Sequence, residues 1–357
     1  MSKCNIVSKK FSPEIIAEFA KLSRVEYGDL PAVTSKDHLN WKHLNGPFGA
    51  STALHLKDGD KIVGRTILQP RTFQLSDKKI KAAFVTDALV HPSYRRPVSN
   101  FLSLTLAIKE AKDFDVIFHS SNEKTENIYK KILRFSNPFS LQGFGLPLKL
   151  GKLFPEKFYL RNIFLKLMGA PYRLTLEAFL YLVRKFIPVN LSEKCPQDFD
   201  EFCQKECQKN NFLTVRNQEI LQWRFRDAPL WKAGVSHVYG QEKYFGYIVW
   251  RQLELSGCSF FVIMDFLLND ELSKPRAFAL RCLLIKKAML SDADIIFTLL
   301  NPRTKLSKKF LGLPFVGVPD KFLPHATPIF VHANNPSLMA MEQETALHLT
   351  LSDIDYF

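Results

Sequence analysis

The sequence is poor in cysteine and glycine and has no long uncharged hydrophobic stretch. Only six of its 357 residues are cysteine and 15 are glycine. These counts exclude a disulfide scaffold and a collagen-like protein. The one run of 18 or more residues without a charged side chain, residues 322–341, is interrupted by three prolines, and residues 1–15 lack the apolar region of a signal peptide. We therefore expect a cytoplasmic protein without a transmembrane helix.

Several binding motifs are missing as well. Neither G-x-x-x-x-G-K-[ST] nor G-x-G-x-x-G occurs, which excludes phosphate-loop NTPases and dinucleotide-binding domains. The sequence has no zinc-finger spacing, RNA-binding aromatic motif or basic tail, so nucleic acid is a disfavoured partner. Cys203 and Cys207 are four residues apart, but no nearby histidine completes a metal site. No metal is expected.

Basic and apolar residues are abundant by contrast. Lysine and arginine number 49 against 35 acidic residues, a net charge of +14, and 46% of the residues are hydrophobic. The chain can build a large core, and its length is about that of two domains. An excess of positive charge attracts polyanions without selecting one. A phosphorylated cofactor and an anionic membrane surface are the candidate partners.

The hydrophobic pattern of the first 135 residues predicts a mixed α/β fold. Asp58-Gly59, between two strand-like stretches, is typical of a tight hairpin. The expected elements, in order, are helices over 13–23 and 37–42, strands over 52–57, 61–70 and 81–90, a helix over 98–113, a strand over 115–121 and a helix over 123–134.

Residues 154–188 have a different composition, rich in phenylalanine and leucine with lysine and arginine between them. One interpretation is one or two helices packed across the two domains. The other is a peripheral surface that contacts anionic lipid or a lipid-linked substrate. The sequence leaves both open.

The chain also repeats itself. At an offset of 182, six of the 26 positions from 39 to 64 are identical, and the similarity continues at offsets of 178 and 179. The offset changes only where loops are expected, so a unit of about 100 residues occurs twice, near 37–135 and 219–315. The matched pairs include Trp41 with Trp223, His55 with His237, Gly64 with Gly246, Asp87 with Asp265 and Asn122 with Asn301.

A strand, a loop and a helix follow one another in the first unit. The apolar strand ends at His91-Pro92, and the loop before the helix carries Arg95 and Arg96. Unpaired N–H groups at a helix N-terminus, with arginine beside them, suit a phosphate or pyrophosphate. The alternative is a plain connection without a ligand.

Residues 84–135 resemble the GNAT superfamily of acyl-CoA-dependent N-acyltransferases. The resemblance lies in V-H-P-x-Y-R at 90–95 and in an Asn, six residues, Tyr-Lys-Lys and a later Phe from Asn122 to Phe135. It implies an α/β fold with a mixed sheet. It also implies an acyl thioester that lies between two splayed strands and is attacked there by an amine.

Combined with the repeat, the resemblance implies two GNAT-like domains in tandem. We expect a cofactor-binding N-terminal domain over 1–140, a connecting segment over 141–195 and a C-terminal domain over 196–357. Asp270 and Glu271 lie where the first unit has its cofactor loop. Because they would repel a pyrophosphate, the second domain is expected to be degenerate.

The resemblance implies acetyl-CoA or another acyl-CoA as the cofactor. Val98 and Asn100 stand where the family has glycine or alanine, and Pro97 lacks an N–H. A looser cofactor site and the loss of coenzyme A binding therefore remain alternatives. The expected cofactor-binding residues are Leu89, Val90, Arg95, Arg96, Val98, Ser99, Asn100 and Asn122.

Three residues are candidates for catalysis. Asp87, on the strand before the loop, fits a general base or a group that orients the amine, although its recurrence in the second unit equally fits a structural role. His91 is a second candidate base. Tyr129 resembles the tyrosine that protonates the leaving thiolate, but Arg134 replaces the glycine that follows it in the family.

The expected activity is therefore the transfer of an acyl group from coenzyme A, acetyl above all, to an amine. The acceptor is expected on a small molecule, an amino sugar or a surface-polymer precursor. Two alternatives are a Fem-like aminoacyl transferase and a non-catalytic binding protein built on decayed GNAT folds. The oligomeric state is not predicted.

Overall fold

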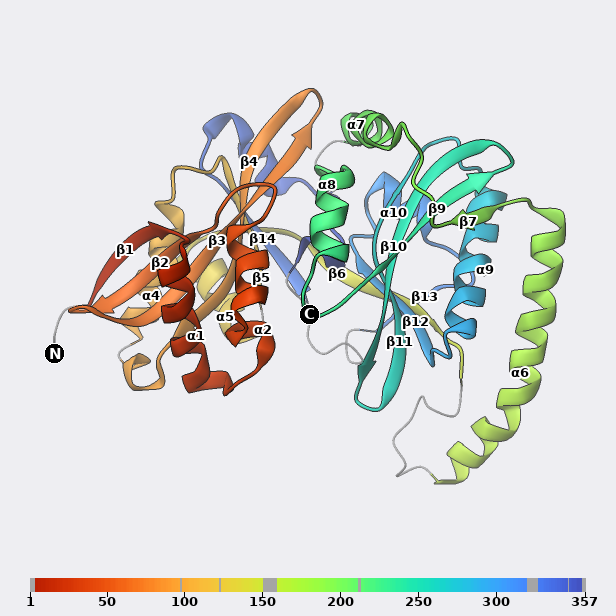
Figure 1. The fold of residues 1–357 in the computed structure, drawn as a ribbon, viewed down its shortest axis with the longest axis horizontal. Coiled ribbons are helices and arrows are strands. Elements are labelled where there is room, and N and C mark those ends of the chain that lie inside the picture. The colour runs from red at the N-terminus through yellow and green to blue at the C-terminus, as the bar shows by residue number, and fades with distance from the viewer. Residues whose placement is uncertain are drawn as a thin grey trace.

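The strands form one continuous sheet that runs the length of the molecule (Figure 1). The computed structural model describes residues 4–96, 98–121, 123–149, 159–210, 213–319, 327–345 and 347–354. Within these residues the strand order is β1-β2-β3-β4-β5-β14-β6-β12-β11-β10-β9-β7, with β8 paired to β3 and β13 to β6. The strands are β1 (Asn5–Lys10), β2 (Thr52–Asp58), β3 (Lys61–Leu75), β4 (Lys78–Val90), β5 (Val116–Ser120), β6 (Ser136–Pro147), β7 (Asn190–Ser192), β8 (Leu213–Thr214), β9 (Gly234–Gly240), β10 (Lys243–Leu255), β11 (Cys258–Leu268), β12 (Ile295–Leu300), β13 (Val316–Val318) and β14 (Thr327–Ala333).

Helices cover both faces of the sheet. The α-helices are α1 (Pro13–Tyr27), α2 (Pro31–Thr34), α3 (Lys36–Leu39), α4 (Ser99–Lys109), α5 (Glu123–Asn127), α6 (Tyr159–Phe186), α7 (Phe199–Lys209), α8 (Gln218–Leu221), α9 (Lys274–Leu290) and α10 (Lys305–Phe310). In the described part of the chain the π-helical turns are η1 (Asn40–Leu44), η3 (Ile128–Ile132) and η5 (Gln222–Arg226), and the 3-10 turns are η2 (Pro92–Tyr94), η7 (Pro336–Gln343) and η8 (Leu351–Asp353). The predicted mixed α/β fold is confirmed.

Strand β6 belongs to both halves of the sheet. Its first half pairs with β14, where Leu141 faces Thr327, and its second half pairs with β12, where Pro147 faces Ile295. On its other side β14 pairs with β5. A strand from the C-terminal part of the chain thus lies inside the N-terminal part of the sheet. The boundary expected between residues 140 and 141 falls within β6.

The same order of elements occurs twice. A four-residue helix and a π turn precede three strands, a long helix and a parallel strand, first from α3 to β5 and again from α8 to β12. Trp41 and Trp223 occupy the same position in the two π turns. Each indole Nε1 donates to the other residue's backbone carbonyl, at 2.6 and 2.9 Å, and the rings lie 5.5 Å apart.

Most elements expected from the pattern are present with shifted ends. Asp58 pairs with Lys61 across the predicted hairpin. The first helix continues to Tyr27, and the helix expected over 98–113 already ends at Lys109. The helix expected over 123–134 is divided into α5 and η3. No strand was expected at β1, a mostly exposed edge strand with little apolar alternation.

The phenylalanines fill the core. Phe73, Phe118, Phe261, Phe266 and Phe310 are fully buried, and all five belong to one hydrophobic cluster that includes strands of both units. Each aromatic side chain buries a large apolar area, so a small number of them is enough to join distant strands. The two units therefore share a core as well as a sheet.

The tryptophan pair offers a direct test of how the units are held together. Trp41→Phe leaves the buried Trp223 carbonyl without its donor and should lower the free energy of unfolding by about 1–3 kcal/mol. The measurement is chemical denaturation. Trp231→Phe is the matched control, since its buried Nε1 has no hydrogen-bond partner within the described residues. Equal losses in the two variants would contradict a role for the reciprocal hydrogen bonds.

Candidate active site

Strands β4 and β5 separate part-way along their length. Their parallel pairing runs from Ala82 with Val116 to Phe84 with Phe118 and stops there, although β4 continues to Val90. Past this point β4 contains a bulge, because two of its residues oppose one residue of β3. Asp87 lies in the bulge with a left-handed φ of 51°. A bulge bends its strand, so the two strands diverge. We call this gap in the strand pairing, which side chains fill, the first opening.

Two aromatic side chains line the first opening. The Nδ1 of His119, the first β5 residue past the pairing, lies 3.0 Å from the Val85 carbonyl oxygen, and its ring stacks on Tyr129 at 4.2 Å. Burial lowers the pKa of His119 to about 4 and raises the pKa of the Tyr129 phenol. At neutral pH the imidazole is therefore uncharged and the phenol keeps its proton. Tyr129 can donate a proton but holds it firmly.

Asp87 forms a buried ion cluster with η1. The Lys42 Nζ lies 2.8 Å and the His43 Nε2 lies 3.1 Å from Asp87 Oδ2. Burial alone would raise the pKa of the Asp87 carboxyl, but Lys42, and then His43, hold it well below its ordinary value. An ionised carboxylate held by two donors orients a cation or an N–H group well and accepts a proton weakly.

Asp87 and Tyr129 lie toward opposite faces of the sheet. Ile67 of β3 packs in the cluster formed by α1, whereas the next residue, Leu68, packs in the cluster that contains α4. Successive strand residues point to opposite faces, so α1 and α4 cover different sides. The His43 partner of Asp87 packs against Phe19 of α1, and Tyr129 belongs to the α4 cluster.

The loop after β4 is held by internal contacts. The Arg95 Nε donates to the Val90 carbonyl at 3.0 Å, and its guanidinium pairs with Glu26. The His91 Nδ1 accepts from the Ser93 backbone N–H at 3.2 Å and so caps the η2 turn. This contact accounts for His91 locally. His91 follows the end of β4. The bulge separates it from the part of β4 that pairs with β5.

Helix α4 begins with an open N-terminus. Val98, its N-cap residue, forms no side-chain cap and is 68% exposed. Asn100 instead donates to the Tyr94 carbonyl at 2.9 Å. The first N–H groups of a helix have no partner within it, so they are oriented to receive an anion. Because the Val98 side chain is exposed to solvent, it does not cover these N–H groups.

The remaining expected cofactor residues are spread around the same strand end. Leu89 and Val90 are buried at the end of β4, whereas Arg96 and Ser99 are exposed in the loop and at the helix start. Asn122 lies outside the described residues. Arg134, where the family has glycine, has a φ of 51°, a conformation that glycine adopts without strain. The backbone at this position therefore has a conformation suited to glycine, with an arginine side chain in its place.

An acyl-CoA fits this arrangement in three respects. The diverging strands, the uncapped start of α4 and the nearby exposed Arg96 place an opening, N–H donors and a cation together. Arg95 is committed to Glu26, and the Val85 carbonyl is committed to His119. Binding in the opening therefore requires His119 to release that carbonyl.

The second unit has an equivalent opening, which the chain itself fills. Pairing of β11 with β12 ends at Ile263 and Thr298, and the Thr298 hydroxyl donates to the Ile263 carbonyl at 3.0 Å. Beyond it, the Asn301 Nδ2 donates to the Thr345 and Leu347 carbonyls at 2.8 and 2.9 Å. The described residues from 347 to 354 are all buried. This C-terminal segment thus covers the end of β12.

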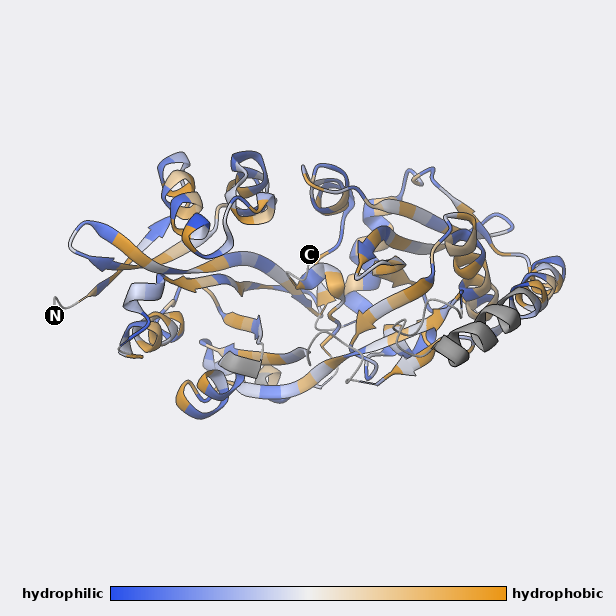
Figure 2. Cartoon of the chain, turned by 90° about the horizontal axis from the view of Figure 1, so that it is seen from below, coloured by the Kyte–Doolittle hydropathy of each residue, from blue (hydrophilic) through white to orange (hydrophobic). Residues whose placement is uncertain are grey.

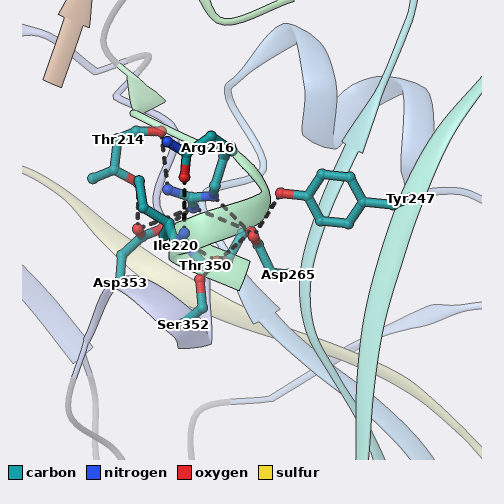
Figure 3. Close-up of polar contacts among 9 residues, drawn as sticks. Thr214, Arg216, Ile220, Tyr247, Asp265, Thr350, Ser352 and Asp353 are labelled. Carbon is teal, nitrogen blue, oxygen red and sulfur yellow. Dashed lines mark hydrogen bonds and ion pairs between the residues drawn. The ribbon is translucent and has the colours of Figure 1, made fainter. Parts of the chain in front are cut away.

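Asp265, the counterpart of Asp87, is enclosed in a separate ion cluster (Figure 3). Arg216 contacts it with two nitrogens, at 2.8 and 3.1 Å, and also contacts Asp353 at 2.9 Å. The Tyr247 and Thr350 hydroxyls donate to the two Asp265 oxygens. Burial opposes the charge of Arg216, but Asp265 and then Asp353 raise its pKa well above the ordinary value. The cluster fixes the C-terminal segment to the second unit.

Solved structures that superpose on this chain include N-acetyltransferases and a probable N-acyltransferase. A GCN5-related N-acetyltransferase from Anabaena variabilis ATCC 29413 superposes with a TM-score of 0.58 at 14% identity, over 92% of this chain and 73% of that one. A probable N-acyltransferase from Enterococcus faecalis V583 gives 0.58 at 10% identity, over 92% and 72%. The chain has the GNAT fold.

A further match is an N-myristoyltransferase. Saccharomyces cerevisiae N-myristoyltransferase, solved with bound myristoyl-CoA, superposes on the GNAT-fold chain with a TM-score of 0.54 at 12% identity, over 92% of this chain and 79% of that one. No family model matches the sequence, and no curated protein is significantly similar to it. These likenesses establish the fold.

Three residues of the first opening were not predicted as site residues. Lys42 and His43 reach Asp87 from a π turn, and His119 enters from β5. Lys42 could have been found from the repeat, because a basic residue follows the tryptophan in both units, Trp41-Lys42 and Trp223-Arg224. For His119 the signal was weaker: a polar ring near the end of a short apolar strand.

No metal centre occurs within the described ranges, which contain no group of three or more His, Cys, Asp or Glu side chains able to hold an ion. Cys203 and Cys207 are buried in α7, and burial raises the pKa of Cys207 to about 11. Both are thiols held in an apolar setting.

His119 should give the protein a measurable dependence on pH. Its folded pKa of about 4 lies below the usual 6.5, so the unfolded chain takes up a proton first as the pH falls. Its contribution to stability is complete above pH 6.5 and is lost toward pH 4, by up to about 3 kcal/mol. His119→Asn, which keeps a donor near the Nδ1 position, should reduce this loss. If the free energies of unfolding of the two proteins fall equally between pH 7 and pH 4, the assignment is contradicted.

Proposed function

We propose that the protein is an acyl-CoA-dependent N-acyltransferase whose active site is the first opening. The observation that carries this proposal is the divergence of β4 from β5 beside the uncapped start of α4. Asp87 and Tyr129 then lie on the two sides of the point where an acyl group would sit. The GNAT fold of the chain and its acyl-CoA-using neighbours support the same activity.

The residues divide the reaction between the two faces. The α4 N–H groups and Arg96 would hold the pyrophosphate of the cofactor, whose thioester would supply the activated acyl group. On the opposite face Asp87 would orient the incoming amine, whose protons would pass to water as its nitrogen bonds to the acyl carbon and the sulfur leaves. Tyr129 would give its phenolic proton to the leaving sulfur and regain a proton from water.

The first unit is the better choice for this site. In the second unit Thr298 and the C-terminal segment occupy the corresponding opening, and Asp265 is bonded to Arg216, Tyr247 and Thr350. Asp270 is paired with Lys305 and Lys309 near the start of α9. We propose that this unit supports the first and shapes its acceptor side.

The acceptor is proposed to be an amine on a small molecule, an amino sugar or a surface-polymer precursor, and the acyl group to be acetyl or longer. A second candidate function is binding without catalysis. The commitments of Arg95 to Glu26 and of His119 to the Val85 carbonyl favour it, because both groups would have to be displaced by a cofactor.

Ligand-induced stabilisation separates the two candidates. Acetyl-CoA, palmitoyl-CoA and free coenzyme A, each at about 100 times its dissociation constant, should stabilise the fold by about 2.7 kcal/mol. The measurement is a thermal shift. Arg96→Ala should weaken the shift, whereas Lys274→Ala, at the start of α9, should not. If none of the three compounds moves the melting temperature, the acyltransferase proposal fails.

The catalytic roles can be tested with acetyl-CoA and glucosamine as a probe amine, by following release of the free thiol. Tyr129→Phe should lower kcat by about 10²-fold and leave KM for acetyl-CoA unchanged, because the phenol acts only on the leaving sulfur. Asp87→Asn should instead raise KM for the amine.

Tyr239→Phe is the matched control for that assay, since its hydroxyl reaches only the Lys194 carbonyl in the second unit. Its kcat should equal that of the parent protein. Full activity in Tyr129→Phe, with the coenzyme A thermal shift intact, would remove Tyr129 as the proton donor without touching the assignment of the cofactor site.

A further inference from the structure

Helix α6 has two apolar faces, and only one of them packs against the described part of the protein. Leu176, Leu180, Val183 and Ile187 recur with helical spacing and pack against the main core beside α9. At about 100° per residue, a second group falls on the outward side of the same helix. Its members are Leu174 at 67% exposure, Tyr181 at 64%, Leu182 at 52% and Phe186 at 74%.

This outward stripe lies at an extreme edge of the molecule. Figures 1 and 2 both place α6 at the end farthest from the N-terminus, alongside α9. Large apolar side chains exposed together on one helix face are unusual for a free surface, since single exposed leucines are normal but continuous stripes mark contact sites. The stripe therefore requires a partner outside the described fold.

One basic residue interrupts the stripe, and two others lie on the flank of α6 next to its core-facing side. Between residues 171 and 187 the helix carries Arg173, Arg184 and Lys185 against a single carboxylate, Glu177, which Arg173 contacts at 3.2 Å. Lys185 falls within the stripe itself, between Tyr181 and Leu182 around the helix. Lysine is depleted from the cores of protein interfaces, whereas its apolar stem and charged end suit the boundary between acyl chains and headgroups.

No helix in the described part of the chain is both long and apolar enough to cross a membrane. An amphipathic helix with aromatic residues and flanking cations instead lies in the plane of the interface. We propose that the outward face of α6 binds the surface of a membrane that contains anionic lipid. The apolar stripe enters the headgroup boundary, and Lys185 contacts lipid phosphates, while Arg184, on the flank of the helix, adds positive charge near the membrane surface. The proposal does not depend on the acyltransferase assignment.

Vesicle co-sedimentation tests it. The probe is a vesicle of phosphatidylcholine with about 30% phosphatidylglycerol, an anionic content similar to that of natural membranes. The protein should bind these vesicles, and should bind vesicles of pure phosphatidylcholine at least about tenfold more weakly. Raising the salt from about 0.05 to 0.5 M should reduce binding to the anionic vesicles, because the Debye length shortens. Equal binding to both vesicles, or to neither, would overturn the proposal.

Two pairs of substitutions locate the surface. Leu174→Ser with Leu182→Ser, and separately Arg184→Gln with Lys185→Gln, should each reduce binding to the anionic vesicles by about tenfold. All four side chains are exposed, so the melting temperature should stay unchanged. Leu30→Ser, at an exposed leucine of the N-terminal unit, is the matched control and should bind as the parent does.

The other occupant of such a face is a second copy of the chain. Light scattering of the lipid-free protein over a range of concentrations distinguishes it from a membrane. A dimer that the Leu174→Ser, Leu182→Ser pair abolishes, without effect on vesicle binding, would assign the stripe to self-association and refute the membrane surface.

Discussion

The architecture depends on β6 serving two neighbours at once. Its first half completes the sheet of the N-terminal unit through β14, and its second half completes that of the C-terminal unit through β12. A strand satisfies its backbone donors and acceptors only through its neighbours, so the two sheets cannot separate without leaving β6 unpaired. The shared phenylalanine core and the reciprocal tryptophan bonds reinforce the same junction. The orientation of one opening relative to the other is thereby fixed.

The two units keep one framework and differ in what it contains. Each has a parallel strand pair that ends early, with a side chain of the shorter strand bonded to a carbonyl of the longer one. In one unit that side chain is a neutral imidazole stacked on a phenol. In the other it is a threonine backed by a fully buried segment of the chain. The aspartate at the bulge is kept in both, but one is held by a lysine and a histidine and the other by an arginine shared with Asp353.

Much of this framework could be predicted from the sequence. The repeat was visible because tryptophan, glycine and aspartate recur at nearly constant offsets, and the first hairpin and the strand–loop–helix connection have strong local signals. The position of β14 could not be predicted, because its partners β5 and β6 lie about 200 residues earlier and pairing at that distance leaves no local pattern. Only part of the ion cluster around Asp87 could be predicted from the sequence. The carboxylate was identified, but its partners come from a π turn whose direction depends on the contact between Trp41 and Trp223.

The interleaving of β14 also bears on how the chain matures during synthesis. Multidomain chains generally fold from the N-terminus as they leave the ribosome, each unit closing before the next appears. Here the N-terminal unit lacks a strand that is encoded at 327–333, so β5 keeps an open edge until that strand has emerged. Its sheet can close only after the strands of its neighbour have also been made. We therefore expect the nascent chain to expose the edge of β5 for most of the synthesis of residues 121–333, which makes it a natural substrate for chaperones that bind extended segments.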